Sequence, residues 1–411
     1  MLHTLLKTSL DVAAIAGGGI GLIPPFDAES LFHSAGVPIE DDPDAVEPLT
    51  AMCRSLDEDI RLSPRAHLLL GRRYVDALRT RRRLLDREAA GDLPVAEESS
   101  PPLVVTGFPR TGTTLAHRLL ASAHDARSPQ WCELMEPGLL PGEPGRQRRR
   151  RLAKWRLAIR LANSMSPSLK RIHEILADGP EECTHLHELA FDTESFALIG
   201  PARGYREWLD ERDAVRKGMR YEWQVRSMNA IVADRSPADR GDRWVLKAPQ
   251  HLCQLDDLLE TFPGATVIRM HRDPVAAMGS VASLVDATGQ LLTPGLPPDH
   301  GEELLEIFTE WQSKGDEAMP RHHDRILEVH YDDLVADPMG FIDRVHGHAG
   351  LPVDGDHADS VTAHLRRRPK HHFGRHRYRL EDHGLEPDRV RIELADYIDR
   401  IDRLKTIPVT A

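Results

Sequence analysis

Residues 102–114 combine a short apolar run with a glycine-rich loop, a pattern typical of phosphate-binding sites. The run Leu103–Val105 predicts a buried strand. The loop after it has the spacing Gly107-x4-Gly112, and the leucines that follow recur with helical period. Backbone N–H groups at the start of such a helix bind anions, because they donate hydrogen bonds at the positive end of the helix dipole. The segment therefore predicts an anion site between a strand and a helix.

The residues after Gly112 differ from those of nucleotide triphosphatases. Those enzymes have a lysine followed by Ser or Thr at these positions, and the lysine contacts the β- and γ-phosphates. This chain has Thr113 and Thr114 there, and its cation lies earlier in the loop as Arg110, next to Thr111. We therefore expect the loop to bind a phosphate-like anion without the usual lysine contact.

A second pair of segments has the same strand-to-helix character. WVLK (244–247) predicts one strand, and ATVIRMHRDP (265–274) predicts another that runs into a polar loop and a helix. Together with PRTGTT (109–114), this order of motifs resembles that of sulfotransferases, which use 3′-phosphoadenosine-5′-phosphosulfate (PAPS). The resemblance covers about residues 100–380, and it implies that residues 110–114 bind the 5′-phosphosulfate.

The resemblance implies further nucleotide contacts. Arg272 and Ser280 have the same spacing in the sequence as the Arg and Ser that hold the 3′-phosphate in that family. A guanidinium supplies charge and donors to a phosphate, and a hydroxyl adds a further donor. Tyr331, in the context Y-x-x-L-x-x-x-P, resembles the family's tyrosine near the nucleotide. Arg375 and Arg377 lie in a segment that resembles one closing over the nucleotide in bacterial relatives, and the motif leaves open which of them contacts phosphate.

The catalytic groups are less clearly marked. Lys247 resembles a lysine of cytosolic sulfotransferases that stabilises charge on the leaving nucleotide. Those enzymes have a histidine two residues later, where this chain has Pro249, so we expect another general base. Our first candidate is Glu133, which resembles in position the glutamate of glycan and tyrosyl-protein sulfotransferases; burial can raise a carboxyl pKa toward neutrality. His251 is the second candidate, and Glu182 is a third.

Two other patterns are interpreted as structural and not as functional sites. His185-x-His187 offers two metal ligands, but no third ligand is evident nearby, so we expect no metal site. The basic run at 146–160 has helical spacing and is typical of a solvated helix face. Contact with an anionic acceptor or with a membrane surface is the alternative for this run.

Composition limits the classes of function. The 411 residues carry a formal net charge of −12, which argues against general binding to nucleic acid. The 4 cysteines show no C-x-x-C pattern and are compatible with a reducing cytoplasm. The apolar segment 10–24 is too short to span a bilayer and contains Asp11. We therefore expect no transmembrane segment and no signal peptide, but a helix that packs on the domain or lines an apolar pocket.

Alternating strands and helices predict an α/β fold, a three-layer parallel sheet with a P-loop-like nucleotide site. Further strands are expected at 244–247, 265–270 and 325–330, and helices at 251–261, 274–285 and about 302–318. We expect a helical N-terminal region at 1–100, an α/β domain at 101–380 with a helical insertion at about 138–240, and a helical tail at 381–411.

The sequence thus predicts a cytoplasmic sulfotransferase that moves a sulfuryl group from PAPS to a hydroxyl of a small-molecule or lipid-like acceptor. The other product would be 3′-phosphoadenosine-5′-phosphate (PAP). The acceptor oxygen is expected to attack in line while a general base takes its proton. Two alternatives stay open: a P-loop nucleotide kinase, which the missing lysine after Gly112 disfavours, and a nucleotide-binding protein without catalysis, which Pro249 keeps open.

Overall fold

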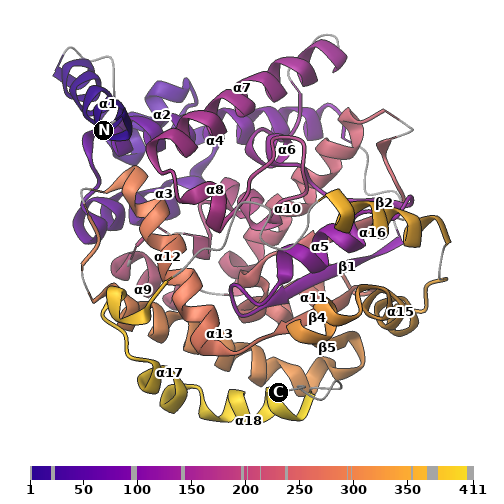
Figure 1. The fold of residues 1–411 in the computed structure, drawn as a ribbon. Coiled ribbons are helices and arrows are strands. Elements are labelled where there is room, and N and C mark those ends of the chain that lie inside the picture. Colours follow the sequence, from indigo (N-terminus) through magenta and orange to yellow (C-terminus); the bar gives the residue numbers. More distant parts are fainter. Residues whose placement is uncertain are drawn as a thin grey trace.

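A five-stranded parallel sheet forms the centre of the molecule, as the computed structural model shows in Figure 1. The structure describes residues 2–19, 24–93, 100–139, 144–195, 199–200, 202–212, 214–236, 239–293, 295–297, 299–352, 355–367 and 378–404. The strands are β1 (Ser100–Gly107), β2 (Ala126–Arg127), β3 (Arg243–Lys247), β4 (Thr266–His271) and β5 (Ile326–His330), in the spatial order β2-β3-β1-β4-β5.

Alternate residues of the central strand β1 face opposite layers of helices. Leu103 and Val105 pack with α5 (Thr113–Leu120) and α15 (Pro338–Ala349). Val104 packs on the other face with α10 (Ala214–Asp234) and α11 (Leu255–Thr261). Because side chains alternate along a strand, an apolar run is buried on both faces. The predicted three-layer α/β fold is confirmed.

Helices precede the sheet and interrupt it between β2 and β3. The first group consists of α1 (Leu2–Gly19), α2 (Ala28–Ala35), η1 (Ile39–Asp41), η2 (Pro43–Ala45), α3 (Val46–Ser55), η3 (Leu56–Ile60) and α4 (Pro64–Ala89). The second group consists of α6 (Trp131–Met135), α7 (Pro144–Met165), α8 (Leu169–Ile172), η4 (Cys183–Ala190), α9 (Arg203–Glu211) and α10. The two groups share an apolar cluster in which Phe32 and Tyr74 meet Phe191 and Tyr205.

The remaining helices follow the strands β3, β4 and β5. They are η7 (Pro249–Gln254), α11, α12 (Pro274–Leu292), α13 (His300–His322), η8 (His323–Arg325), α14 (Tyr331–Ala336), α15, α16 (Gly355–Arg367), η9 (Leu380–His383), α17 (Pro387–Glu393) and α18 (Ala395–Leu404). Among the described residues, only α12 is long and apolar enough to qualify as a membrane span. It packs between α13 and the C-terminal helices. In its most apolar 18-residue stretch 61% is buried, as in the core helix of a globular protein.

The strands expected at 244–247, 265–270 and 325–330 are present within one residue of those limits. The two-residue strand β2 was not expected, because a pair of residues carries no periodic signal. The helix expected at 251–261 is divided into η7 and α11. Pro249 begins the 3-10 turn, and the α-helical part starts only at Leu255.

Candidate active site

The loop between β1 and α5 can adopt its conformation only with glycine at two positions. Gly107 has φ 140°, and a Cβ atom there would lie 2.3 Å from the carbonyl oxygen of Met270 on β4. Gly112 has φ 93°, and its Cβ atom would lie 2.5 Å from the ring of Tyr331. Any larger residue would push β1 away from β4 or the loop away from the tyrosine. The spacing read from the sequence is therefore a requirement of this loop.

Arg110 connects the two predicted anion motifs. Its Nε donates to Ser280 Oγ (3.0 Å), and its Nη2 donates to the carbonyl oxygen of Ile172 (2.7 Å). Arg272 Nη1 in turn donates to the carbonyl oxygen of Arg110 (3.1 Å). Burial lowers the pKa of Arg110, and the carboxylate of Glu182 partly offsets that effect. Two segments some 160 residues apart thus form one cationic site.

Tyr331 forms the wall of this site at the start of α14. The guanidinium carbon of Arg272 lies 4.6 Å from the centre of the tyrosine ring, a cation–π contact. An open cavity of about 210 Å³ lies at this place. It is lined by Pro109, Arg110, Gly112, Thr113, Thr114, Leu115, His173, Glu182, Pro249, Gln250, Leu284, Arg272, Trp311 and Tyr331.

A buried cluster of charges lies beside the cavity. Lys247 at the end of β3 donates to Glu182 Oε1 (2.7 Å) and Glu181 Oε1 (3.3 Å). Burial alone would lower the pKa of Lys247, but the two carboxylates outweigh it and raise that pKa. Burial likewise opposes ionisation of Glu181, yet His173, whose Nε2 is 3.1 Å from Glu181 Oε2, and Lys247 hold the Glu181 pKa well below its usual range. Glu182 is the carboxylate that reaches the cavity.

Backbone hydrogen bonds hold the segment that carries these two glutamates. Trp131 N–H donates to the carbonyl of Gly179 (3.1 Å), Cys132 N–H to that of Ala177 (3.0 Å), and Glu181 N–H to that of Pro129 (3.1 Å). The segment 177–181 therefore runs beside the start of α6. This pairing places Glu182 between α6 and the end of β3, next to Lys247.

The fold and the sequence have counterparts among known proteins. The model of the "Sulfotransferase family" matches residues 101–355, which is more than half of the chain. The chain belongs to the sulfotransferase family. The omega-hydroxy-beta-dihydromenaquinone-9 sulfotransferase Stf3 of Mycobacterium bovis is 25% identical over 320 residues, 71% of this chain and 79% of that protein; the Stf3 of Mycobacterium tuberculosis gives the same values.

Two solved structures share the fold of this sulfotransferase. The sulfotransferase STF1 from Mycobacterium tuberculosis H37Rv superposes with a TM-score of 0.74 at 22% identity, over 90% of this chain and 100% of that one. The sulfotransferase STF9 from Mycobacterium avium superposes with a TM-score of 0.73 at 24% identity, over 92% and 97%. The chain is therefore a sulfotransferase enzyme, and the kinase and the catalytically inactive protein considered from the sequence are set aside.

Glu133 does not lie at the cavity of this sulfotransferase. It is 3% exposed, and Arg235 donates to both of its carboxylate oxygens (2.9 and 2.5 Å). The same carboxylate accepts from the backbone N–H of Gln130 in a capping box at the start of α6. These contacts occupy the carboxylate, so the first candidate for the base instead anchors the helix beside the segment 177–181.

His251 is also removed from the cavity. Its Nδ1 lies 2.9 Å from the Tyr221 hydroxyl and its Nε2 lies 3.0 Å from Cys183 Sγ, so both ring nitrogens have partners in the core. Burial, with a smaller effect from the charge of Arg220, lowers the pKa of His251 to about 3. The second candidate is a buried neutral histidine that cannot swing into the site.

The structure brings the predicted nucleotide-binding residues together. Arg110, Gly112, Thr113, Thr114, Arg272 and Tyr331 line one cavity, and Ser280 is bonded to Arg110 behind it. The Thr111 hydroxyl donates to the carbonyl of Phe108 (2.7 Å), so it stabilises the loop. Arg375 and Arg377 lie outside the described residues.

Several cavity residues were missed in the sequence, and three of them carry polar side-chain atoms. His173 follows α8, Gln250 lies in η7, and Trp311 lies in α13. None belongs to a motif with fixed spacing, since each comes from a different helical segment. Only Gln250 had a sequence signal, namely its position three residues after Lys247, close to the strand end where a base was expected.

Proposed function

We propose that the sulfuryl donor is PAPS, with its 5′-phosphosulfate in the β1–α5 loop and its 3′-phosphate at Arg272 and Ser280. The observation that carries this proposal is the pair of hydrogen bonds from Arg110 to Ser280 and from Arg272 to the Arg110 carbonyl, which join two anion sites in one cavity. The glycines of the loop let its backbone approach an anion closely, and the residues around it supply cationic and hydroxyl donors. These residues fit a nucleotide with phosphate at both ends.

Glu182 is the proposed general base, in place of Glu133 and His251. Among the described residues that line the cavity it is the carboxylate, and its charge acts on Arg110 of the loop. PAPS supplies an activated sulfuryl group when bound. Glu182 would take the proton of the acceptor hydroxyl, and Lys247, which is fully buried behind it, would orient that carboxylate as a positioning residue.

Replacing Arg272 by alanine is expected to weaken PAP binding by about 2–3 kcal/mol, because a charge-assisted contact to phosphate is lost. Isothermal titration of the full chain with PAP measures this change. Arg321→Ala is the control, since Arg321 is an exposed arginine that pairs with Asp256 away from the cavity. ATP with Mg²⁺ should bind much more weakly than PAP to the unchanged protein. An equal dissociation constant for PAP in Arg272→Ala and in the unchanged protein would contradict the proposed 3′-phosphate site.

We propose a lipid-like alcohol as the acceptor. The name of the relative Stf3 gives a hydroxylated menaquinone as its substrate. Leu115, Leu284 and Trp311 add apolar surface to the same cavity as Glu182, which suits an apolar alcohol more than a charged sugar. Transfer of labelled sulfate from PAPS to a panel of alcohols, from phenols to polyprenyl alcohols, tests this assignment. A preference for sugars would contradict it.

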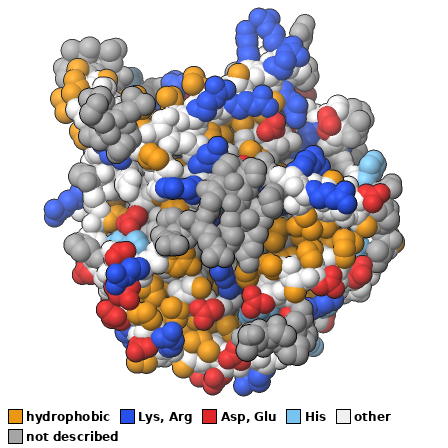
Figure 2. Space-filling model, viewed as in Figure 1, with side chains coloured by type: hydrophobic (Ala, Val, Ile, Leu, Met, Phe, Trp, Pro, Cys, Tyr) orange, Lys and Arg blue, Asp and Glu red, His pale blue; other side chains and the backbone are white. Residues whose placement is uncertain are grey.

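An exposed surface formed by α1 and α7 is a second argument for an acceptor that resides in a membrane. The two helices pack against each other and expose Val12, Ile15, Leu157 and Leu161, with exposed fractions between 48 and 63%. The same helix α7 carries several arginines, and Figure 2 shows basic side chains along α7 at the top of the view. In a chain of net charge −12, such a basic and apolar face suits an anionic lipid surface. We propose a cytoplasmic enzyme with peripheral membrane contact.

The double substitution Leu157→Ser and Leu161→Ser is expected to lower binding to anionic vesicles about tenfold or more, because two leucines no longer enter the lipid. Cosedimentation with phosphatidylglycerol-containing vesicles measures this, with phosphatidylcholine vesicles as the neutral comparison. Ile392→Ser is the matched control, since Ile392 is 72% exposed on α17, far from α7 in Figure 1. Equal binding of all three proteins would contradict the proposed surface.

A further inference from the structure

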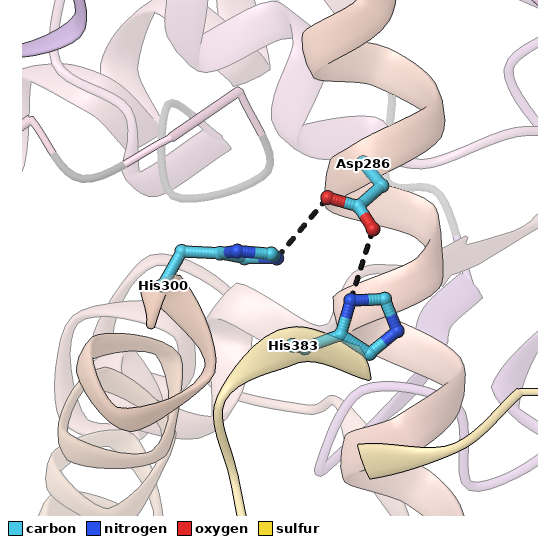
Figure 3. A group of neighbouring side chains, drawn as sticks. All are labelled: Asp286, His300 and His383. Atoms are coloured by element: carbon cyan, nitrogen blue, oxygen red, sulfur yellow. Dashed lines mark ion pairs between the residues drawn. The ribbon is translucent and has the colours of Figure 1, made fainter. Parts of the chain in front are cut away.

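Three side chains from three separate segments converge beside α12, as Figure 3 shows. Asp286 lies on α12, His300 is the first residue of α13, and His383 lies in η9. His300 Nε2 lies 3.2 Å from Asp286 Oδ1, and His383 Nδ1 lies 2.9 Å from Asp286 Oδ2. The two histidines are 5% and 6% exposed. The cluster is separate from the catalytic cavity, because none of these three residues lines it.

The hydrogen bond at the other nitrogen of His300 fixes its tautomer. Nδ1 lies 2.8 Å from the carbonyl oxygen of Pro297. A carbonyl can only accept, so Nδ1 must carry the hydrogen. In a neutral imidazole the remaining nitrogen, Nε2, then presents a lone pair. That lone pair faces the carboxylate of Asp286.

The tautomer of His383 follows in the same way. Its Nε2 lies 3.4 Å from the hydroxyl oxygen of Ser283, and that hydroxyl donates its own hydrogen to the carbonyl of Gly279 (3.0 Å). The serine oxygen therefore offers His383 Nε2 only an acceptor. In the tautomer that uses this acceptor, Nδ1 presents its lone pair to Asp286, as Nε2 of His300 does.

In these tautomers two nitrogen lone pairs and a carboxylate face one another, an arrangement that a cation between them stabilises. Within the part of the chain that the structure describes, Asp286 is the group that His300 Nε2 and His383 Nδ1 face, at 3.2 and 2.9 Å. Each ring instead donates its other N–H to an oxygen acceptor, which is the arrangement that orients histidines bound to metals. We propose that Asp286, His300 and His383 bind a divalent first-row transition ion such as Zn²⁺.

The spacing and exposure of the cluster suit such an ion. The ligand atoms lie within 4.8 Å of one another, and closure to about 3.3 Å would give tetrahedral zinc with bonds near 2.0 Å. The side chain of Asp286 is 36% exposed, and it borders an open pocket with Gln290 and Thr293. An ion can therefore reach the site from solvent and keep water at its remaining position.

The ion would join the C-terminal segment to the helix that carries Ser280. The ring of Tyr378 packs on α12 so closely that a Cβ atom at Gly279 would lie 2.4 Å from it, and the Tyr378 hydroxyl donates to the Ala276 carbonyl (2.8 Å). His383 follows in the same segment. Metal binding is expected to stabilise this contact, so its role is structural and separate from sulfuryl transfer.

The test is a metal titration of the full chain, prepared without a histidine tag and treated with a chelator. We expect one equivalent of Zn²⁺ by calorimetry, a rise in the unfolding temperature with Zn²⁺, and visible absorption bands with Co²⁺. Asp286→Asn and His383→Gln should each lower the affinity for Zn²⁺ tenfold or more and remove the Co²⁺ bands. Asp256→Asn is the control: it removes the carboxylate of the exposed His322–Asp256 pair, which has no third ligand among the described residues, and binding should not change.

The titration of the unchanged chain does not depend on how well any variant folds. If that chain binds no more Zn²⁺ than Asp286→Asn, the proposal is overturned. The same holds if Zn²⁺ leaves the unfolding temperature unchanged.

Discussion

Replacing Glu182 by glutamine is expected to lower kcat for sulfuryl transfer about 100-fold or more, while the dissociation constant for PAP changes little. Glutamine keeps an oxygen for the hydrogen bond from Lys247 but cannot accept the acceptor's proton, and loss of a general base has effects of this size. Single-turnover transfer of labelled sulfate measures the rate, and calorimetry with PAP measures the binding.

Two further variants separate Glu182 from its neighbours. Glu133→Gln should leave kcat per folded molecule nearly unchanged, because Glu133 pairs with Arg235 away from the cavity. His173→Asn should have a smaller effect than Glu182→Gln, since His173 lines the cavity but its Nε2 is bonded to Glu181. A larger loss of kcat in His173→Asn would assign the proton transfer to the imidazole and would contradict the proposed base.

Replacing Lys247 by methionine is expected to lower the free energy of unfolding by about 3–5 kcal/mol, because it leaves Glu181 and Glu182 without their buried cation. The side chain of Lys247 is fully buried, so bulk solvent does not reach the position of the ammonium. Urea unfolding followed by circular dichroism measures the change. The triple variant that also carries Glu181→Gln and Glu182→Gln should regain part of the loss, since no unpaired carboxylate is then buried.

Lys314 provides the matched control for this effect. It also pairs with two carboxylates, those of Asp210 and Glu310, but its side chain is 43% exposed. Lys314→Met should therefore lower the free energy of unfolding by about 1 kcal/mol or less. Equal losses of unfolding free energy in the two variants would mean that burial of Glu181 and Glu182 does not require the Lys247 ammonium. The direct catalytic role expected from the sequence would then be the alternative for Lys247.

The sheet and the residues that line the proposed nucleotide site were predictable because each is determined by a short stretch of sequence. The apolar run Leu103–Val105 and the two glycines after it specify a strand and a loop without help from the rest of the chain. The carboxyl ends of parallel strands meet at one edge of the sheet. Recognising β1 and β4 as strands therefore predicts that Arg110 and Arg272, which follow them, lie near each other, as they do.

The proposed general base, Glu182, was only the third candidate from the sequence, because its position depends on contacts across the fold. Glu182 is 65 residues from Lys247, and it reaches the cavity because the segment 177–181 pairs with the start of α6. His251 has the right residue type close to the right strand, but the sequence does not reveal that Tyr221 and Cys183 enclose its ring. The three residues of the proposed metal site likewise come from different elements, α12, α13 and η9.

The guanidinium of Arg110 is already immobilised by Ser280 and by the carbonyl of Ile172 before any anion arrives. A long side chain that becomes ordered only on association loses about 1.5–2 kcal/mol of rotamer freedom. Here that loss belongs to folding, so the proposed binding of a sulfated nucleotide and release of its desulfated product would require no rearrangement of the arginine.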